Sequence, residues 1–189
     1  MFILRRQYLI LILLLALVLY LLPQAARQLY PFPYQEIVRR YAHEQRLDPA
    51  LIAAVARVES KFYVWAESPQ GARGLMQLMP DTARQAAAEL GLPFEPDRLF
   101  EPEYNLCLGS WYLSHLIQEF GDLTPALAAY NGGQGNVQSW LDKGIWDGSS
   151  HNLQQIPFAE TREYVSRVYK NYRIYRLLYP DVNQQVFKS

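Results

Sequence analysis

The chain has 189 residues, of which half are apolar and 14% are aromatic, and its 18 basic residues balance 18 acidic ones. This length and composition suit one globular domain with a single substantial core. Because no basic run or stripe is present to neutralise phosphates, the sequence argues against a nucleic-acid partner.

The first element in chain order is a hydrophobic segment, which follows MFILRR and runs uninterrupted from Tyr8 to Leu22. As a helix it would span about 22 Å, a length that fits either a membrane anchor or the apolar region of a signal peptide. The following PQAARQ is a poor cleavage site, since Pro23 or Gln24 would stand three residues before the cut. We therefore interpret residues 1–27 as an uncleaved anchor, with a cleaved signal peptide as the alternative. A buried core helix is disfavoured because no polar face is visible.

Charges beside this segment predict its orientation. Arg5 and Arg6 should stay on the cytoplasmic side, so the chain after Leu22 is exported under either interpretation. The stretch after Leu22 contains three prolines, Pro23, Pro31 and Pro33, and should form a short, extended tether, of which residues 28–33 lead into the domain.

From Tyr34 onward the sequence indicates a series of helices. Their ends carry recognisable signals: Asp48 is an N-cap before Pro49, and Pro180 stops the last helix. Gly121 closes a long helix because glycine readily adopts the left-handed conformation that ends one. We expect helices at about residues 34–46, 49–60, 81–90, 103–120, 125–130 and 159–179.

The segments between these helices are rich in Gly, Pro, Ser and Asn and show no convincing strand alternation. A minor hairpin is expected around residues 61–75. The predicted fold class is therefore all-α, with one domain at residues 34–180 and a C-terminal tail at residues 181–189.

Cysteine and histidine give no sign of a metal or cofactor. Cys107 is the only cysteine, so it cannot form an internal disulfide, and its apolar neighbours suggest a small core residue. His43, His115 and His151 are scattered without ligand spacing. We predict neither a metal site nor a cofactor.

Glu59 is the first candidate catalytic residue because its position in its helix is unusual. Residues at i, i+3, i+4 and i+7 share one helical face, so Glu59 lies on the apolar stripe of Ile52, Val55 and Ala56. Burial should raise the pKa of its carboxyl group. A glutamate with a pKa of about 6 to 7 is protonated about a tenth to half of the time at pH 7, so it can act as a general acid. The alternative is a frayed last turn with the carboxylate in solvent or paired with a distant arginine.

Two loops hold further candidates. SPQGARGLMQLMP, residues 68–80, has glycines that permit special backbone conformations, and it leads into the next helix. AAYNGGQGNV places Tyr130 and Asn131 at a helix end before three glycines, in a loop that either wraps a ligand or turns the chain. Each segment alone is weak evidence for a site.

Taken together, four segments resemble, in order, the signature segments of the soluble lytic transglycosylases of bacterial cell walls. They are ES at 59–60, SPQGARGLMQLMP at 68–80, AYNGG at 129–133 and IPFAETREYVSRV at 156–168. The resemblance covers about residues 35–179. It implies a lysozyme-like helical domain with a cleft, and a peptidoglycan glycan strand as substrate, cut between N-acetylmuramic acid and N-acetylglucosamine.

The same resemblance implies roles for individual residues. Glu59 matches the catalytic acid of the family. The substrate-binding candidates match cleft residues that position that acid and the sugars: Ser68, Gln77, Met79, Tyr130, Asn131, Glu160 and Tyr164. For the two tyrosines, aromatic packing at a helix interface is the alternative.

The family's chemistry suits a chain with one evident catalytic carboxyl group. Hydrolysis of the lysozyme type usually needs a second carboxylate, and none stands out. Glu67 lies in a polar loop, and Asp81 reads as an N-cap. With one carboxyl group, Glu59 would protonate the leaving oxygen and then accept the proton of the C6 hydroxyl of muramic acid, which closes a 1,6-anhydro ring.

Three functions therefore stay open: a lytic transglycosylase, which the sequence favours, a hydrolytic muramidase like goose-type lysozyme, and an inactive wall-binding scaffold. The expected location is the inner membrane, with one N-terminal anchor and the catalytic domain in the periplasm. Secretion to the periplasm after signal cleavage is the alternative. Endo or exo action and any envelope complexes are not indicated by the sequence.

Overall fold

The computed structural model describes residues 2–184. It divides into two compact units, residues 1–33 and residues 34–189, which are described separately.

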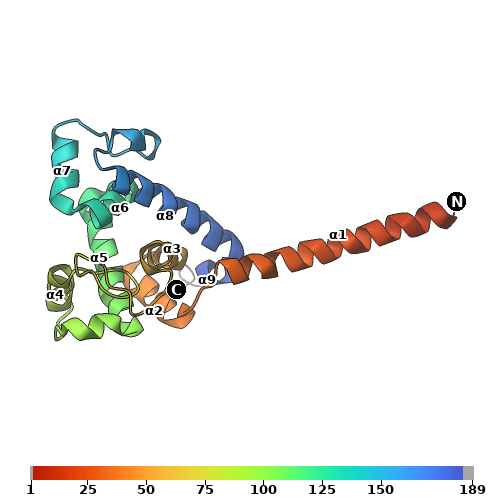
Figure 1. Cartoon of the computed structure of the whole chain (residues 1–189), viewed down its shortest axis with the longest axis horizontal. Coiled ribbons are helices and arrows are strands. Elements are labelled where there is room, and N and C mark those ends of the chain that lie inside the picture. The colour runs from red at the N-terminus through yellow and green to blue at the C-terminus, as the bar shows by residue number, and fades with distance from the viewer. Residues whose placement is uncertain (1, 185–189) are drawn as a thin grey trace. The chain divides into compact units, whose positions relative to one another are not determined.

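The first unit is one long helix, α1, which spans Phe2–Leu29 and is red to orange in Figure 1. Its segment Ile10–Leu29 has a mean hydropathy of 2.1 and is long and apolar enough to cross a membrane, a criterion that signal sequences also meet. The predicted extended tether is wrong from Pro23 to Leu29, because the helix continues through the proline. Apolar and alanine-rich flanks favour helix on both sides of it.

The second unit is helical, and the all-α prediction is confirmed. Its elements are α2 (Gln35–Gln45), α3 (Pro49–Ser60), α4 (Pro80–Glu89), η1 (Pro96–Phe100), α5 (Pro102–Phe120), α6 (Leu123–Gly132), α7 (Gln134–Asp142), η2 (Ser150–Gln155), α8 (Ala159–Leu178) and α9 (Pro180–Gln184). Within residues 34–184 the expected hairpin is reduced to isolated antiparallel bridges, which join Glu67 to Arg73 and Arg73 to Leu78.

Several elements differ from the sequence prediction: η1, η2, α7 and α9 were not expected, and α6 begins earlier than expected. α7 was not expected because its first turn follows glycines, which disfavour helix. It forms because Val137 and Trp140 are buried, and tertiary packing outweighs local propensity. α6 begins at Leu123, earlier than expected, because the side chain of Asp122 accepts a hydrogen bond from the Thr124 amide at 2.8 Å and caps the helix.

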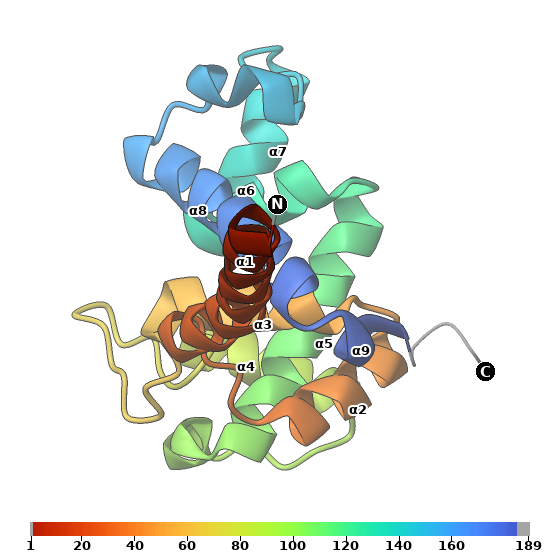
Figure 2. The ribbon, with the colours of Figure 1, turned by 90° about the vertical axis from the view of Figure 1, so that its right-hand side faces the viewer.

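The core is organised around α3 and α5. Every residue of α3 from Pro49 to Ala56 is buried, and the helix packs against α8, α2 and α9. Its alanines let neighbouring helices approach closely. α5 contacts α2, α4 and α6 and is the green helix that links the lower and upper groups of helices in Figure 1. The predicted core position of Cys107 is confirmed, since this free cysteine is buried. The loop after α3, yellow in Figure 2, leads to α4.

The beginning of α3 is tied to α8 by Asp48. One carboxylate oxygen accepts a hydrogen bond from the Ala50 amide at 2.9 Å, which confirms the predicted N-cap. The other oxygen accepts a hydrogen bond from the Tyr172 hydroxyl at 2.7 Å and lies 3.6 Å from the Arg176 guanidinium. The burial of the Tyr172 ring and its bond to Asp48 raise the pKa of that phenol to about 12. Asp48 therefore fixes the position of α3 along α8.

Replacing Asp48 by alanine should lower the free energy of unfolding by about 1–2 kcal/mol, because it removes an N-cap and the acceptor of the Tyr172 hydroxyl. Urea denaturation followed by circular dichroism measures the change. Glu89→Ala, at an exposed position at the end of α4, is the matched control and should stay within about 0.5 kcal/mol. Equal stability of the Asp48 variant and the native protein would contradict this account.

Candidate active site

Glu59 lies in the last turn of α3, on the stripe that the sequence predicted. Ile52, Val55 and Ala56 are fully buried, and Glu59 itself is partly exposed. Its side chain lines an open cavity of about 490 Å³ at the end of the helix. The other lining residues come from the same turn and from the loop that follows: Val58, Ser60, Lys61, Tyr63, Trp65, Ala66, Glu67 and Gln77.

The charge of Glu59 is set mainly by burial. Desolvation raises the pKa of its carboxyl group to about 7, and the nearby Glu160 carboxylate acts in the same direction. The Tyr164 hydroxyl and the Arg167 guanidinium oppose this shift. Both charged neighbours come from α8, a helix more than 100 residues further along the chain. At pH 7 about half of the Glu59 side chains therefore carry a proton.

Two tyrosines stand beside this carboxyl group. The rings of Tyr130 and Tyr164 are parallel, with centroids 6.5 Å apart. The Tyr130 hydroxyl donates a hydrogen bond to the Met76 carbonyl oxygen at 2.8 Å. Burial, followed by the charge of Glu59, raises the pKa of both phenols well above the ordinary value. Both hydroxyls therefore keep their protons and remain hydrogen-bond donors.

The Tyr164 hydroxyl is buried without a hydrogen-bond partner within the described residues. It lies close enough to Glu59 to affect the pKa of that carboxyl group, but outside the geometry of a good hydrogen bond. An unpaired buried hydroxyl costs about 1–3 kcal/mol. A small shift of Glu59 or a bound acceptor would satisfy this donor.

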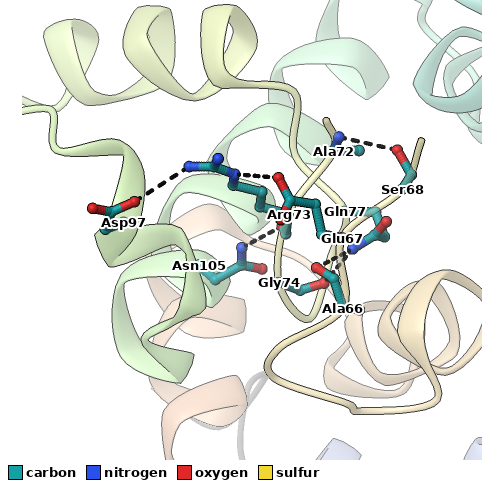
Figure 3. Close-up of polar contacts among 9 residues, drawn as sticks. All are labelled: Ala66, Glu67, Ser68, Ala72, Arg73, Gly74, Gln77, Asp97 and Asn105. Atoms are coloured by element: carbon teal, nitrogen blue, oxygen red, sulfur yellow. Dashed lines mark hydrogen bonds and ion pairs between the residues drawn. The ribbon is translucent and has the colours of Figure 1, made fainter. Parts of the chain in front are cut away.

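The loop between α3 and α4 forms the opposite side of the cavity. Gln77 joins separate parts of this loop through hydrogen bonds. The Gln77 side-chain amide donates hydrogen bonds to the carbonyl oxygens of Ala66 and Gly74, both at 3.0 Å (Figure 3). Gln77 has a φ of +47°, a conformation that costs about 1–2 kcal/mol for a residue with a side chain. The two hydrogen bonds help to offset this cost.

Gly74 is required by space as well as by conformation. Its φ is +75°, and a Cβ atom there would lie 2.0 Å from the Leu99 carbonyl oxygen and 2.3 Å from the Asn105 side-chain nitrogen. Both neighbours are fixed parts of the core. Any other residue at this position would push the loop away from α5.

Asn105 is a buried residue that the sequence analysis missed. Its amide nitrogen donates to the carbonyl oxygens of Arg73 and Leu99 at 2.9 and 2.8 Å, and its amide oxygen accepts from the Met76 amide at 2.8 Å. The side chain is fully buried. A polar residue in the first turn of α5, directly before the apolar run at residues 106–108, was the available signal, since such residues are buried only when their hydrogen bonds are satisfied.

Arg73 holds the outer edge of the loop. Its guanidinium group pairs with Glu67 at 3.0 Å and with Asp97 at 3.4 Å, as Figure 3 shows. Asp97 belongs to η1, so these pairs join the loop to a neighbouring element. The Asp97 carboxylate is almost fully exposed and that of Glu67 about half exposed, so each pair adds little stability by itself. Glu67 nevertheless has a fixed partner while it lines the Glu59 cavity.

The remaining predicted site residues lie in several parts of the domain. The Ser68 hydroxyl accepts a hydrogen bond from the Ala72 amide at 3.0 Å and so shapes a turn of the loop. Met79 is 42% exposed at the start of α4. The Asn131 amide oxygen accepts from the Thr161 hydroxyl at 2.8 Å, which links α6 to α8. Glu59 and Gln77 are the two predicted residues that line the cavity.

Comparison with known proteins assigns this chain to one family. The family model of the transglycosylase SLT domain matches residues 36–152. The chain is 36% identical over 157 residues to the soluble lytic murein transglycosylase of Escherichia coli strain K12, and the match covers 80% of this chain and 24% of that protein. It is 34% identical over 140 residues to the membrane-bound lytic murein transglycosylase C of Actinobacillus pleuropneumoniae serotype 5b, covering 68% of this chain and 38% of that protein.

A solved structure gives the same result. The fold superimposes with a TM-score of 0.72 on an inactive glutamate-to-glutamine mutant of the lytic transglycosylase Slt from Pseudomonas aeruginosa, at 34% identity, with 83% of this chain and 26% of that one covered. The chain therefore spans about a quarter of the length of the soluble relatives that it matches.

The raised pKa of Glu59 makes the stability of the domain depend on pH. In the unfolded chain a glutamate loses its proton near pH 4.5, whereas the folded protein keeps this proton up to about pH 7. The folded state thus binds more protons between these values, and stability falls as pH rises through this range. Below pH 4.5 Glu59 is protonated in both the folded and the unfolded state, so it no longer lowers the free energy of unfolding.

Glu59→Gln mimics the protonated form, so its melting temperature should exceed that of the native protein at pH 8, and the difference should shrink towards pH 4.5. Thermal unfolding of the full chain in detergent at several pH values measures this. Glu163→Gln, on the exposed face of α8, controls for the loss of one negative charge. A difference that stays constant from pH 4.5 to 8 would show that Glu59 is solvated.

Proposed function

The chain belongs to the transglycosylase SLT family, and from this premise we propose that it is a lytic transglycosylase acting on peptidoglycan. The proposed reaction cleaves the β-1,4 bond between N-acetylmuramic acid and N-acetylglucosamine and leaves a 1,6-anhydro-muramic acid end. The observation that carries the proposal is Glu59, a cavity-lining carboxyl group with a pKa of about 7. Such a group can donate and accept a proton within one catalytic cycle.

In the proposed mechanism Glu59 first acts as an acid. It protonates the glycosidic oxygen, the bond from C1 of muramic acid breaks, and N-acetylglucosamine leaves with a free C4 hydroxyl. The N-acetyl group of muramic acid stabilises the positive charge at C1. Glu59, now a carboxylate, accepts the proton of the C6 hydroxyl while that oxygen bonds to C1. The ring closes without water, and Glu59 is protonated again for the next cycle.

Two features of the site support this double role. The pKa of about 7 keeps both protonation states populated, and the buried Tyr164 hydroxyl has no hydrogen-bond partner among residues 2–184. A small shift of Glu59 as it becomes a carboxylate would let it accept a hydrogen bond from this hydroxyl, which would stabilise the form that appears after bond cleavage. In the Pseudomonas aeruginosa relative a single glutamate-to-glutamine change gives an inactive protein.

The other predicted site residues have proposed roles in binding the glycan. Gln77 and Ser68 shape the loop across the cavity from Glu59, and Tyr130 supports that loop through the Met76 carbonyl oxygen. The partly exposed Met79, Asn131 and Glu160 are proposed contacts to the sugars or their substituents. No cofactor enters this mechanism.

Hydrolysis by a muramidase is the second candidate, because Glu67 lines the same cavity as Glu59. A second carboxylate could activate water or act as a nucleophile. Its ion pair with Arg73 at 3.0 Å holds the Glu67 side chain at the loop and favours the transglycosylase.

We also propose that α1 anchors the protein in the inner membrane with the domain in the periplasm. The support is the apolar segment Ile10–Leu29, the basic residues that precede it, and the similarity to a relative named membrane-bound. Release into the periplasm after cleavage of a signal peptide is the alternative.

Digestion of purified sacculi tests the activity and the chemistry together. The main glycan products should end in 1,6-anhydro-muramic acid and weigh one water less than hydrolysis products, as measured by mass spectrometry. Glu59→Gln should slow the digestion by about 10²- to 10⁴-fold, since it can no longer transfer the proton. Near-normal activity of this variant would refute the role of Glu59. Reducing-end products that carry heavy oxygen from labelled water, abolished by Glu67→Gln, would make the protein a hydrolase.

Cell fractionation tests the location. The full-length protein should be found in the membrane fraction, and protease added from the periplasmic side should digest the domain, because the uncleaved α1 holds it there. A control in which the apolar segment is replaced by a cleavable signal peptide should release the domain. A soluble mature protein that begins near Ala25 would identify α1 as a signal peptide.

A further inference from the structure

Two large aromatic side chains are exposed beside Glu59. Tyr63 is 60% and Trp65 is 64% exposed, and both line the cavity that contains the Glu59 carboxyl group. A tryptophan is rarely left so open to water, and adjacent exposed aromatic surface usually marks a binding site. Neither residue belongs to the signature segments on which the sequence analysis relied.

The backbone determines that these two side chains point outwards. Residues 62 to 65 alternate between partly buried and exposed, and the ring of Phe62 packs edge-on against Tyr175 in the core, with centroids 6.3 Å apart. The Tyr63 amide donates to the Ser60 carbonyl oxygen at 3.0 Å, and the Ala66 amide donates to the Tyr63 carbonyl oxygen at 3.2 Å. These contacts hold the segment in one register.

The indole of Trp65 is also supported from the side. Its ring lies 5.4 Å from that of Phe100 in η1, and the Arg73 guanidinium lies 5.4 Å from the centre of the Phe100 ring. Arg73 in turn is held by its carboxylate partners in the loop and in η1. The indole is therefore positioned before any ligand arrives, which lowers the entropic cost of binding.

The geometry points to a sugar-stacking surface: Trp65, with Tyr63 beside it, binds the face of an N-acetylhexosamine ring of the glycan strand next to the ring that Glu59 acts on. A β-1,4-linked hexosamine carries its hydroxyl and amide groups around its edge and its C–H groups on its faces. These weakly positive C–H groups suit the negative face of an indole, and contact removes apolar surface of both partners from water. The inference rests on the proposed function and adds a specificity residue to it.

Binding can be tested without turnover in the full-length Glu59→Gln protein, with a pentamer of β-1,4-linked N-acetylglucosamine as the probe. The chain has four tryptophans; Trp140 and Trp146 are 6% and 1% exposed, and Trp111 is partly buried. The probe should therefore shift the tryptophan fluorescence to the blue and protect it from acrylamide quenching. Trp65→Leu should abolish both effects.

Kinetics on soluble glycan strands give a second readout. Trp65→Ala should raise KM by about tenfold with kcat within about twofold, because the stacked ring is bound equally in the ground and transition states. Trp65→Phe should retain most of the affinity, since an aromatic face remains. Leu177→Ala, which removes a 79% exposed apolar side chain on α8, should change neither constant.

The outcomes separate this inference from the proposed function. Suppose that the native protein digests sacculi, that Trp65→Ala keeps the native KM, and that the probe leaves the fluorescence unchanged. The stacking surface is then refuted, and the proposed transglycosylase activity is retained. If Trp65→Ala instead lowers binding to phospholipid vesicles and not to the pentamer, the patch faces a membrane and the inference is also refuted. If sacculi stay intact but the pentamer protects Trp65, the activity is refuted and sugar binding stands.

Discussion

The buried amide of Asn105 is the interaction on which the site depends, because it fixes the loop that the other parts of the site contact. Its hydrogen bonds hold both ends of the segment from Arg73 to Met76 against α5. Neighbouring carbonyl oxygens in this segment accept hydrogen bonds from Ser60, next to Glu59 on α3, and from Tyr130 on α6. Three helices therefore meet at one short loop. Because Gly74 lies directly against Leu99 and Asn105, with no space for a side chain, the loop packs closely on α5.

A second constraint is the packing of α3 against α8. α3 delivers Glu59, and α8 delivers the tyrosine, arginine and glutamate that tune the pKa of its carboxyl group. A glutamate at the end of a fully exposed helix would be ionised at neutral pH. Here the apolar surroundings raise the pKa of the Glu59 carboxyl group towards 7, and the charged groups on α8 determine the size of this shift. The same contact that stabilises the domain therefore also sets the pKa of the Glu59 carboxyl group, and Asp48 at the other end of α3 keeps the two helices in register.

Most helices could be predicted from the sequence because their ends carry local signals. Asp48, Gly121 and Pro180 act through hydrogen bonds or dihedral angles of the adjacent turn, so no distant contact is needed to interpret them. α7 could not be predicted, because its stability comes from burying Trp140 against distant residues. The continuation of α1 through Pro23 was missed for the opposite reason: a strong local helix breaker was outweighed by the apolar helix around it.

For the site, the sequence by itself indicated where the Glu59 carboxyl group would lie. The spacing of Glu59 from Ile52 and Val55 places a carboxyl group on a buried helical face, and helical geometry alone is sufficient for that conclusion. It also determined that the loop before α4 contains unusual glycines. Only the tertiary structure decided which charges face Glu59, that Asn105 holds the loop, and that Trp65 lies open beside the acid. These facts depend on contacts between residues 29 or more positions apart, or on the degree of exposure of a side chain, and neither follows from local spacing.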